Sequence, residues 1–440
     1  MYRYRPVPAV GDLELTDTQV AYAYWNGRWT LSTLLVPTSN GQVVPGGFLL
    51  VAASSGPDPA TTVYTLQSFS VCPGITNAMP DEPILGVSHN FNGDSGRAVV
   101  GLRCIVGNSS AGDTIYDINL TQLQNGTTAN YHTFQPGTFD LRPVTNITTN
   151  GSAVWLTTVV VPAALGKTAL PMVSFYKLQP VAGAIADDTL TLWGQITGIT
   201  PVVNTGDVIL APQPPVNPAT FNGCDSPGTG NPDCIVIDGL DPTSGYFVTS
   251  GLNGDNYLAT AYAAEDPGGG GEYDLAMLNP QTGVKKLMQT PFSEIVGYPS
   301  VTLDLDYEAV VNYTEFSISS PSVSDYDIWK YSPLTNPTIF SAFKSVVASS
   351  QAITSTCGQI FPDPVTGGMA PVCRWGDYTS ALFDDEVACE NSGAPECPVF
   401  WMVDEFTAND GLSNGCTNAG TEQCTRLKPV TDPVVVSGDT

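Results

Sequence analysis

The chain has 440 residues, with 42 acidic side chains against 15 basic ones, which gives a formal net charge of −27. Nucleic acids and anionic membranes are poor partners for such a chain, because binding phosphate groups requires clustered lysine and arginine. Charged residues make up only 13% of the sequence, against about a quarter in ordinary soluble domains, so uncharged polar side chains must cover most of the surface.

Strand patterns begin near the N-terminus and recur along the whole chain. Residues 20–36 predict a β-hairpin around Asn26-Gly27, and residues 273–288 predict another around a turn at 279–283. Further short runs rich in Val, Thr, Tyr and Trp predict strands at 153–162, 188–197, 257–263 and 301–316. Helical periodicity is confined to residues 339–349, where we expect one short helix.

A tripeptide of Tyr, Asp and an apolar residue recurs at Tyr116, Tyr273 and Tyr326, and Phe175 begins a degenerate fourth copy. The copies are separated by about 50 to 60 residues or twice that length, which is typical of a four-stranded propeller blade with long loops. The alternative is that the tripeptide recurs only because Tyr and Ile favour strands.

The strands and the repeat together predict an all-β fold, a β-propeller of about seven four-stranded blades with disulfide-closed loops, rather than a sandwich or a simple barrel. We expect an N-terminal arm at residues 1–15, the propeller domain at 16–427, and a C-terminal tail or closing strand at 428–440.

The ten cysteines occur as close neighbours along the chain, and they are Cys72, Cys104, Cys224, Cys234, Cys357, Cys373, Cys389, Cys397, Cys416 and Cys424. An even number in close pairs indicates disulfides formed in an oxidising compartment, although the sequence does not fix their connectivity. A zinc site is disfavoured, since the chain contains no CxxC motif and only two histidines, His89 and His132.

Six N-glycosylation motifs point to the same compartment, at Asn108, Asn119, Asn125, Asn146, Asn150 and Asn312. No apolar run long enough for a membrane helix or a signal peptide occurs. We therefore expect an exported chain, extracellular or on the cell surface, whose signal peptide is not part of this sequence.

One stretch resembles a known family. Residues Arg374, Trp375, Gly376, Asp377 and Tyr378, followed by Phe400 and Trp401, are similar to a signature of exported bacterial β-propeller proteins related to the sialidase-like superfamily. The resemblance covers residues 373–406 well and the remainder thinly. It implies a propeller fold and a structural role for the motif, and it says little about function, because most members are uncharacterised.

Three catalytic hypotheses can be weighed. Gly93-Asp94-Ser95-Gly96 suggests a serine protease, but His89 is the only earlier histidine and lies too close, so a turn between strands is favoured. A sialidase would need an arginine triad, and no arginine lies between Arg142 and Arg374. A glycosidase could use a pair drawn from the acidic residues near the C-terminus, namely Asp384, Asp385, Glu386, Asp404 and Glu405.

Calcium is the one cofactor that the sequence suggests. Asp304 and Asp306, like Asp325 and Asp327, alternate along strands, so each pair projects from one face and offers hard oxygen ligands. The alternative is a solvated acidic face, and no EF-hand loop is present.

We therefore predict a non-catalytic extracellular or cell-surface glycoprotein that serves in adhesion, binding or self-assembly into a filament or layer, with no assigned catalytic residue. Its partner would be another copy of itself, or an extracellular glycan or protein. Residues 1–10, with Arg3 and Arg5, could dock on the acidic body of a neighbouring copy. The alternative is a glycan-processing hydrolase with a carboxylate pair at the propeller mouth, drawn from Asp384, Asp404 and Glu405.

Overall fold

The computed structural model describes residues 12–39, 42–89, 96–107, 109–137, 141–146, 153–160, 172–181 and 184–197, and from residue 208 onward the strands given below with a few residues beside them. Contact clustering divides the chain into two compact units. The first consists of Met1–Thr158 and Ser174–Gly194, and the second of Val159–Val173 and Gln195–Thr440.

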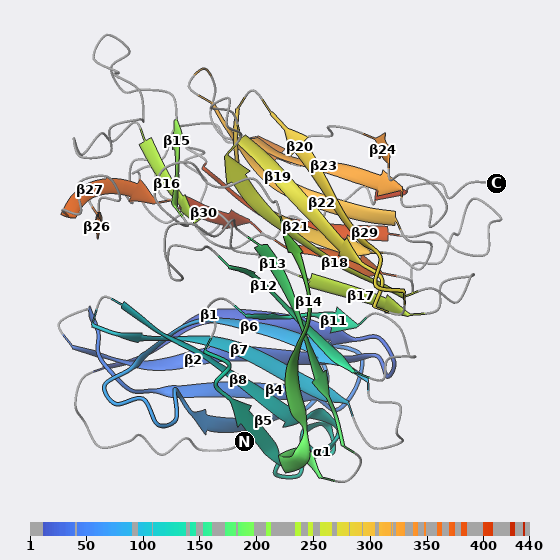
Figure 1. Ribbon diagram of the computed structural model, residues 1–440. Helices are drawn as coiled ribbons and strands as arrows, with labels where there is room; N and C mark the ends of the chain where they lie inside the picture. The colour runs from blue at the N-terminus through green and yellow to red at the C-terminus, as the bar shows by residue number, and fades with distance from the viewer. Residues whose placement is uncertain are drawn as a thin grey trace. The chain divides into compact units, whose positions relative to one another are not determined.

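The described strands form seven sheets of four or five strands (Figure 1). Sheet A contains β1 (Asp12–Ala23), β2 (Arg28–Ser39), β3 (Gln42–Val43), β4 (Phe48–Ser54) and β5 (Tyr64–Ser70). Sheet B contains β6 (Met79–Ser88), β7 (Arg97–Val106), β8 (Ser109–Asn119) and β9 (Tyr131–Phe134). Sheet C contains β10 (Arg142–Pro143), β12 (Val154–Val160), β13 (Met172–Gln179) and β14 (Thr189–Thr197). Three short elements lie between these strands, namely α1 (Leu120–Gln124), β11 (Thr145–Asn146) and the 3-10 helix η2 (Ile185–Asp187).

Sheet B is the middle layer of the first unit. Its strands alternate, so one face packs on sheet A through residues such as Val100 and Tyr116, which share a core cluster with Leu34 and Leu49. The opposite face packs on sheet C, where Val99 and other apolar residues meet β12 and β13. Two apolar faces on one sheet explain why β7 is an almost continuous buried run rather than an alternating one.

A glycine permits the close approach of sheet B to the chain that enters sheet C. A Cβ atom at Gly101 would lie 2.2 Å from the carbonyl oxygen of Leu141. Any side chain there would push the backbone apart, because such a contact is far inside van der Waals distance.

The second unit contributes four sheets. Sheet D contains β17 (Gly245–Thr249), β18 (Asn256–Glu265), β19 (Gly271–Leu278) and β20 (Lys285–Pro291). Sheet E contains β15 (Val208–Pro212), β16 (Cys234–Asp238), β26 (Gln359–Pro362) and β27 (Met369–Arg374). Sheet F contains β21 (Ile295–Leu303), β22 (Glu308–Phe316), β23 (Val323–Lys330), β24 (Thr338–Ser341) and β25 (Val347–Ala348). Sheet G contains β28 (Ser380–Asp384), β29 (Val399–Thr407), β30 (Gln423–Arg426) and β31 (Val434–Val435).

Sheets D and F are packed face to face, and their strands β19 and β21 are buried along their whole length. Aromatic rings fill the space between them, with the ring centroids of Tyr273 and Tyr313 5.1 Å apart and that of Phe292 within 6 Å of both. The edge of β19 comes so close to β21 that the Gly271 amide donates a hydrogen bond to Glu294 O at 2.8 Å.

The expected fold class is confirmed at the level of its sheets: the described chain is nearly all strand, and its seven four- or five-stranded sheets equal the number of blades expected. Most sheets are antiparallel meanders of consecutive strands. Sheet E departs from this pattern, because β16 pairs in parallel with β27, far away in the sequence. The last strand, β31, pairs with β29 of sheet G.

Both predicted hairpins are confirmed, as β1–β2 and β19–β20. The Tyr-Asp repeat has a structural meaning, since Tyr116, Tyr273 and Tyr326 all lie on the third strand of their sheet, as does Phe175. The expected helix at 339–349 is wrong, because β24 and β25 occupy its ends. The expected strand at 301–316 is in fact the end of β21 and the whole of β22.

One predicted disulfide lies within the described residues. Cys72 and Cys104 are joined, with their Cα atoms 5.8 Å apart, and the bridge ties the segment after β5 to β7. The side chains of the other eight cysteines lie outside the described residues, so their pairing stays a prediction. In the part of the chain that the structure describes, no helix is long and apolar enough to cross a membrane.

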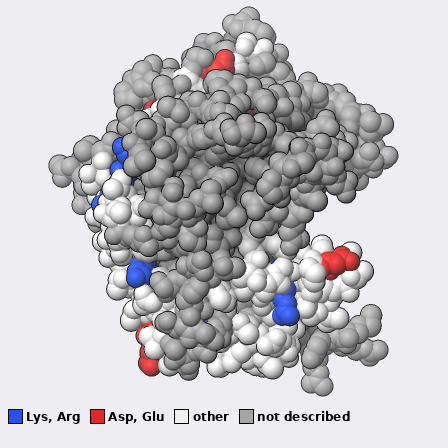
Figure 2. All heavy atoms as spheres, turned by 90° about the vertical axis from the view of Figure 1, so that its right-hand side faces the viewer, with Lys and Arg blue, Asp and Glu red and all other residues white. Residues whose placement is uncertain are grey.

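Charged side chains are sparse on the surface that can be seen. Figure 2 shows the described lysines, arginines, aspartates and glutamates of one face as isolated groups among uncharged residues.

Candidate functional site

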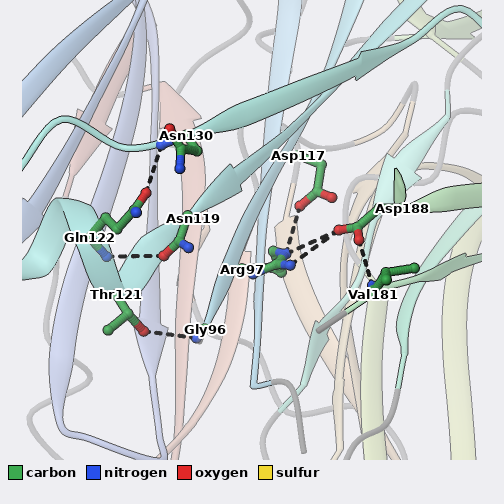
Figure 3. Close-up of polar contacts among 9 residues, drawn as sticks. All are labelled: Gly96, Arg97, Asp117, Asn119, Thr121, Gln122, Asn130, Val181 and Asp188. Carbon is green, nitrogen blue, oxygen red and sulfur yellow. Dashed lines mark hydrogen bonds and ion pairs between the residues drawn. The ribbon is translucent and has the colours of Figure 1, made fainter. Parts of the chain in front are cut away.

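A cluster of three buried charged groups lies in the first unit (Figure 3). Arg97 begins β7, Asp117 lies diagonally across from it on β8, and Asp188 directly precedes β14. The Arg97 Nε atom is 3.3 Å from Asp117 Oδ1, and Nη2 is 3.2 Å from Asp188 Oδ2. All three side chains are at most 3% exposed, so the cluster is closed to solvent.

The local sequence fixes the start of β7 beside this cluster. Asn119 caps helix α1 by accepting a hydrogen bond from the Gln122 amide at 3.0 Å. The next hydroxyl, Thr121 Oγ1, accepts a hydrogen bond from the Gly96 amide, and the Asn130 amide donates to Gln122 Oε1 (Figure 3). Helix α1 therefore holds the residue before Arg97 and positions the guanidinium.

The cluster carries two carboxyl groups and one guanidinium. Burial and the neighbouring Asp188 raise the pKa of Asp117 well above its ordinary value, although Arg97 acts in the opposite direction. The second carboxyl, Asp188, accepts a hydrogen bond from the Val181 amide as well as those from Arg97. Asp117 is therefore the group that stays protonated, and Asp188 is the one that pairs with Arg97.

A second polar network joins sheets D and F inside the second unit. The Tyr262 hydroxyl donates to Asp274 Oδ2 at 2.7 Å within sheet D. The Tyr273 hydroxyl donates to Asp327 Oδ2 at 2.6 Å, and the Trp329 indole donates to the same hydroxyl at 2.7 Å. Both aspartates are fully buried, and both belong to the Tyr-Asp repeat.

Other acids, not cations, dominate the electrostatics of this network. Burial and the adjacent Glu272, two residues away on the same face of β19, raise the pKa of Asp274 to about 8. Glu272 itself is 4% exposed and accepts a hydrogen bond from Gln289 Nε2 at 3.3 Å. Asp274 therefore holds a proton at neutral pH.

The network continues toward solvent at one end of sheet F. Glu315 on β22 and Asp325 on β23 are diagonal neighbours on one face, since Glu315 lies opposite Val323 and Asp325 opposite Tyr313. Glu315 is half-buried and Asp325 is 9% exposed, so this is where the acidic face becomes accessible. Glu294, whose Oε1 accepts a hydrogen bond from Ser317, is half-buried beside them.

The accessible pair has the properties of an acid–base site. Burial, then Asp325 and Glu294, raise the pKa of Glu315 to about 7, and burial and Asp327 raise the pKa of Asp325. The fully buried Tyr313 hydroxyl on the same face has no hydrogen-bond partner among the described residues. A buried hydroxyl without a partner is costly, so this position lowers the stability of sheet F. We call Tyr313, Glu315 and Asp325 the sheet F site.

Three of the described arginines, Arg97, Arg103 and Arg142, pair with carboxylates of the protein itself. Besides Arg97, Arg103 contacts Glu82 at 3.3 Å and Arg142 contacts the same carboxylate at 2.7 Å. Glu82 stands at a β-bulge with a φ of 47°, a conformation that its two partners stabilise.

Two of the acids expected for a glycosidase pair, Asp384 and Asp404, lie far apart along sheet G, while Asp385 and Glu386 lie outside the described residues. Asp384 lies opposite Val399 at one end of the β28–β29 hairpin, whereas Asp404 lies opposite Arg426 on β30. Five residues of strand separate Val399 from Asp404, a distance of about 17 Å. Glycosidase pairs are about 5 to 9.5 Å apart, so Asp384 and Asp404 do not form one along this hairpin.

The remaining predicted residues have mixed outcomes. In the family motif, Arg374 ends β27 and Phe400 and Trp401 lie on β29, while Trp375 to Tyr378 and every side chain of the motif lie outside the described residues. Residues Gly93 to Ser95 also lie outside them, and Gly96 directly precedes β7.

The calcium hypothesis stays a prediction. Asp304 and Asp306 lie outside the described residues, while Asp325 and Asp327 alternate on β23 as expected. Within the described part of the chain, no three His, Cys, Asp or Glu side chains are arranged to hold a metal ion.

Two predicted glycosylation sites are wrong. Asn312 is 0% exposed in the middle of sheet F and Asn146 is 1% exposed, so neither has room for a sugar in the folded chain. Asn125 is exposed at the end of α1, and Asn119 is half-buried as the cap of that helix. Asn108 and Asn150 lie outside the described residues.

Sequence reasoning missed the acids that matter most in the structure. In the sequence, Asp117 and Asp274 are marked only by the Tyr-Asp repeat, which predicts blade spacing, whereas Asp327 is also a calcium candidate. Glu315 had no such mark. Its role follows from pairing between strands, which no local pattern of the sequence reveals.

Comparisons with known proteins give only distant similarities. No family model matches the chain, and no curated protein matches it. Among solved structures, it is similar to a thermostable family-43 glycoside hydrolase with 11% identity and a TM-score of 0.32, over 79% of this chain and 99% of that one. It is also similar to a family-43 β-1,3-galactosidase, with 11% identity and a TM-score of 0.25, over 73% of this chain and 60% of that one.

A third similar structure is prolyl oligopeptidase B from Galerina marginata, with 9% identity and a TM-score of 0.24, over 88% of this chain and 55% of that one. Similarity at this level identifies neither a family nor an activity for this chain.

Proposed function

We propose that the chain is a glycan-processing hydrolase whose carboxyl pair is Glu315 and Asp325. The observation that carries this proposal is the placement of the two acids as diagonal neighbours on one face of sheet F, beside the unpartnered Tyr313 hydroxyl. Diagonal neighbours on adjacent strands are about 7 to 8 Å apart, within the range used by pairs of glycosidase carboxyls, about 5 to 9.5 Å.

The two acids would divide the work according to their environments. Glu315, with a pKa raised to about 7, keeps its proton at mildly acidic pH and would protonate the oxygen of the leaving sugar. Asp325 would act as the ionised partner, as base or nucleophile.

The two glycoside hydrolases among the similar structures agree with this proposal, but it does not rest on them. The disulfide between Cys72 and Cys104 supports action in an oxidising compartment, such as the extracellular space.

The test is release of nitrophenol from a panel of nitrophenyl glycosides, including the β-galactoside, measured against pH. We expect Glu315→Gln and Asp325→Asn each to reduce kcat at least about 100-fold, as loss of a general acid or base does. Glu14→Gln is the matched control, since Glu14 is an exposed acid on β1.

Two results would contradict the proposal. One is activity that both variants retain in full. The other is wild-type protein that hydrolyses no glycoside in the panel although circular dichroism shows it folded.

A second candidate is the non-catalytic, self-assembling surface protein, and one observation favours it. Strand β1 is an edge of sheet A and exposes Leu13, Leu15 and Val20, at 41%, 62% and 48%. A long apolar edge strand is a surface on which another chain can add a strand. Light scattering of Leu15→Lys against wild type tests this, and a wild type that is monomeric at all concentrations argues against it.

A further inference from the structure

The connection between β13 and β14 is held to sheet B by the buried hydrogen bonds of one carboxylate, that of Asp188. Asp188 bonds to Arg97 of β7 through Oδ2 and accepts the Val181 amide through Oδ1, at 2.5 Å. A single carboxylate therefore holds both ends of this connection, Val181 and Asp188, and joins them to the start of β7 (Figure 3).

We infer that Asp117, Asp188 and Arg97 form a proton-dependent clasp, which closes the β13–β14 connection onto sheet B when Asp117 is protonated and loosens it when Asp117 ionises. We call these three residues the clasp. It belongs to the first unit alone and does not depend on the proposed hydrolase activity.

The argument begins with the count of charges. The clasp contains two carboxyl groups and one guanidinium, all at most 3% exposed. With one proton on the pair, the clasp is neutral, which is the state that burial tolerates. With both carboxyls ionised, it carries an unbalanced negative charge away from water.

The geometry of Asp117 indicates where the proton lies. Its two carboxyl oxygens are buried and accept no hydrogen bond from the described residues, and its contact with Arg97 is an ion pair at 3.3 Å. Asp188, by contrast, already accepts three hydrogen bonds from N–H groups. A protonated Asp117 can donate to Asp188, whereas an ionised one repels it, and the raised pKa of Asp117 has this same cause.

Three titratable or charged groups face Asp117 from the elements around it. Arg97 comes from β7 and Asp188 from the connection before β14. The third, His132, lies directly opposite Asp117 on β9, and its buried Nδ1 has no partner among the described residues. A histidine that gained a proton would stabilise an ionised Asp117, so the experiment must separate the two groups.

Hydrogen exchange of the intact chain, followed by mass spectrometry from about pH 5 to about pH 9 and corrected for the intrinsic rate, tests the clasp. In wild type we expect protection of peptides covering residues 172–197 to fall, by up to roughly tenfold for each pH unit, as pH rises from the ordinary pKa of an aspartate toward the raised pKa of Asp117, and to level off above it. Peptides from β2 and β4 serve as internal references.

Asp117→Asn resembles the protonated side chain and should keep residues 172–197 protected across the same pH range. Asp187→Asn, a change at the exposed neighbour of Asp188, is the matched control and should behave as wild type. The proposal is overturned if wild-type protection does not depend on pH. It is also overturned if Asp117→Asn keeps the wild-type dependence, or if His132→Asn abolishes it. If Asp117→Asn does not fold, the pH series of wild type and of His132→Asn still tests the proposal.

Discussion

Buried acids occur in both units, but their surroundings differ. In the first unit, Asp117 and Asp188 share the guanidinium of Arg97, which makes the cluster a mixture of opposite charges. In the second unit, the largest charge effects on Asp274 and Glu315 come from other carboxyl groups, and tyrosine hydroxyls supply the hydrogen bonds.

The stability of the two units should therefore be sensitive to different changes. Removing the cation from a buried ion cluster leaves uncompensated charge, so the first unit should respond most to substitution of its arginine. Protonated acids that are bonded to tyrosines have no cation beside them, so the stability of the second unit should depend on pH rather than on any arginine. Substitutions in both units test this difference, and the largest effect is expected at Arg97.

Arg97→Met should lower the free energy of unfolding by about 3 to 5 kcal/mol at neutral pH, because Asp188 then stays buried without its partner. Arg28→Met, at a half-buried arginine of β2, is the control and should change stability by less than about 1 kcal/mol. Urea denaturation followed by circular dichroism measures both. Equal effects of the two substitutions would contradict the assignment of Arg97 as the neutralising group.

Replacing Cys72 and Cys104 together by serine should destabilise the first unit by about 3 to 4 kcal/mol, since the bridge spans 32 residues of chain. This double substitution distinguishes the two units, because it acts on the first unit alone. Thermal unfolding should show an earlier transition that is absent from wild type. If the single wild-type transition only shifts as a whole, the two units unfold together.

Tyr273→Phe should cost about 1 to 3 kcal/mol, because the hydroxyl both donates to Asp327 and accepts from Trp329, and its loss leaves buried partners unsatisfied. Tyr131→Phe is the control, since Tyr131 is 48% exposed. Chemical denaturation of the two variants gives the comparison. No difference between them would show that the network contributes nothing to stability.

Asp274→Asn should have the smallest effect in acid and change mainly the dependence on pH. The pKa of Asp274 is raised from 3.8 to about 8, so the folded chain binds a proton that the unfolded chain has released between these values. Stability due to this group is therefore complete in acid and is lost as pH rises toward about 8.

The measurement is the midpoint of thermal unfolding from about pH 4 to about pH 9. Wild type should lose stability over this range more steeply than Asp274→Asn. Parallel curves would mean that Asp274 is not the titrating group.

Much of the architecture could be predicted from local patterns. Alternating residues and turn dipeptides such as Asn26-Gly27 act between neighbours in sequence, so the hairpins β1–β2 and β19–β20 could be predicted. The prediction of a helix at 339–349 was wrong because it too relied on a local pattern. Short apolar runs fit either period, and here pairing with β23 selects strands at β24 and β25.

The candidate site depended on contacts that no local pattern contains. Glu315 and Asp325 are neighbours because β22 and β23 pair in one particular register. Burial has the same origin, which is why Asn312 reads as a glycosylation site in sequence and is enclosed in sheet F. The Tyr-Asp repeat is the exception, a local signal that marks buried acids on the third strand of three sheets.

Sheet E has a consequence for the order in which the molecule forms. Ile235 of β16 pairs in parallel with Cys373 of β27, and the strands of sheet F lie between them in the sequence. Such a distant pairing requires closure of a very long loop, which makes it slow in comparison with the hairpins around it. During synthesis, β15 and β16 must wait until sheets D and F have been made, so we expect sheet E to be completed after both of them and its unpaired strand edges to be the main risk for aggregation of nascent chains.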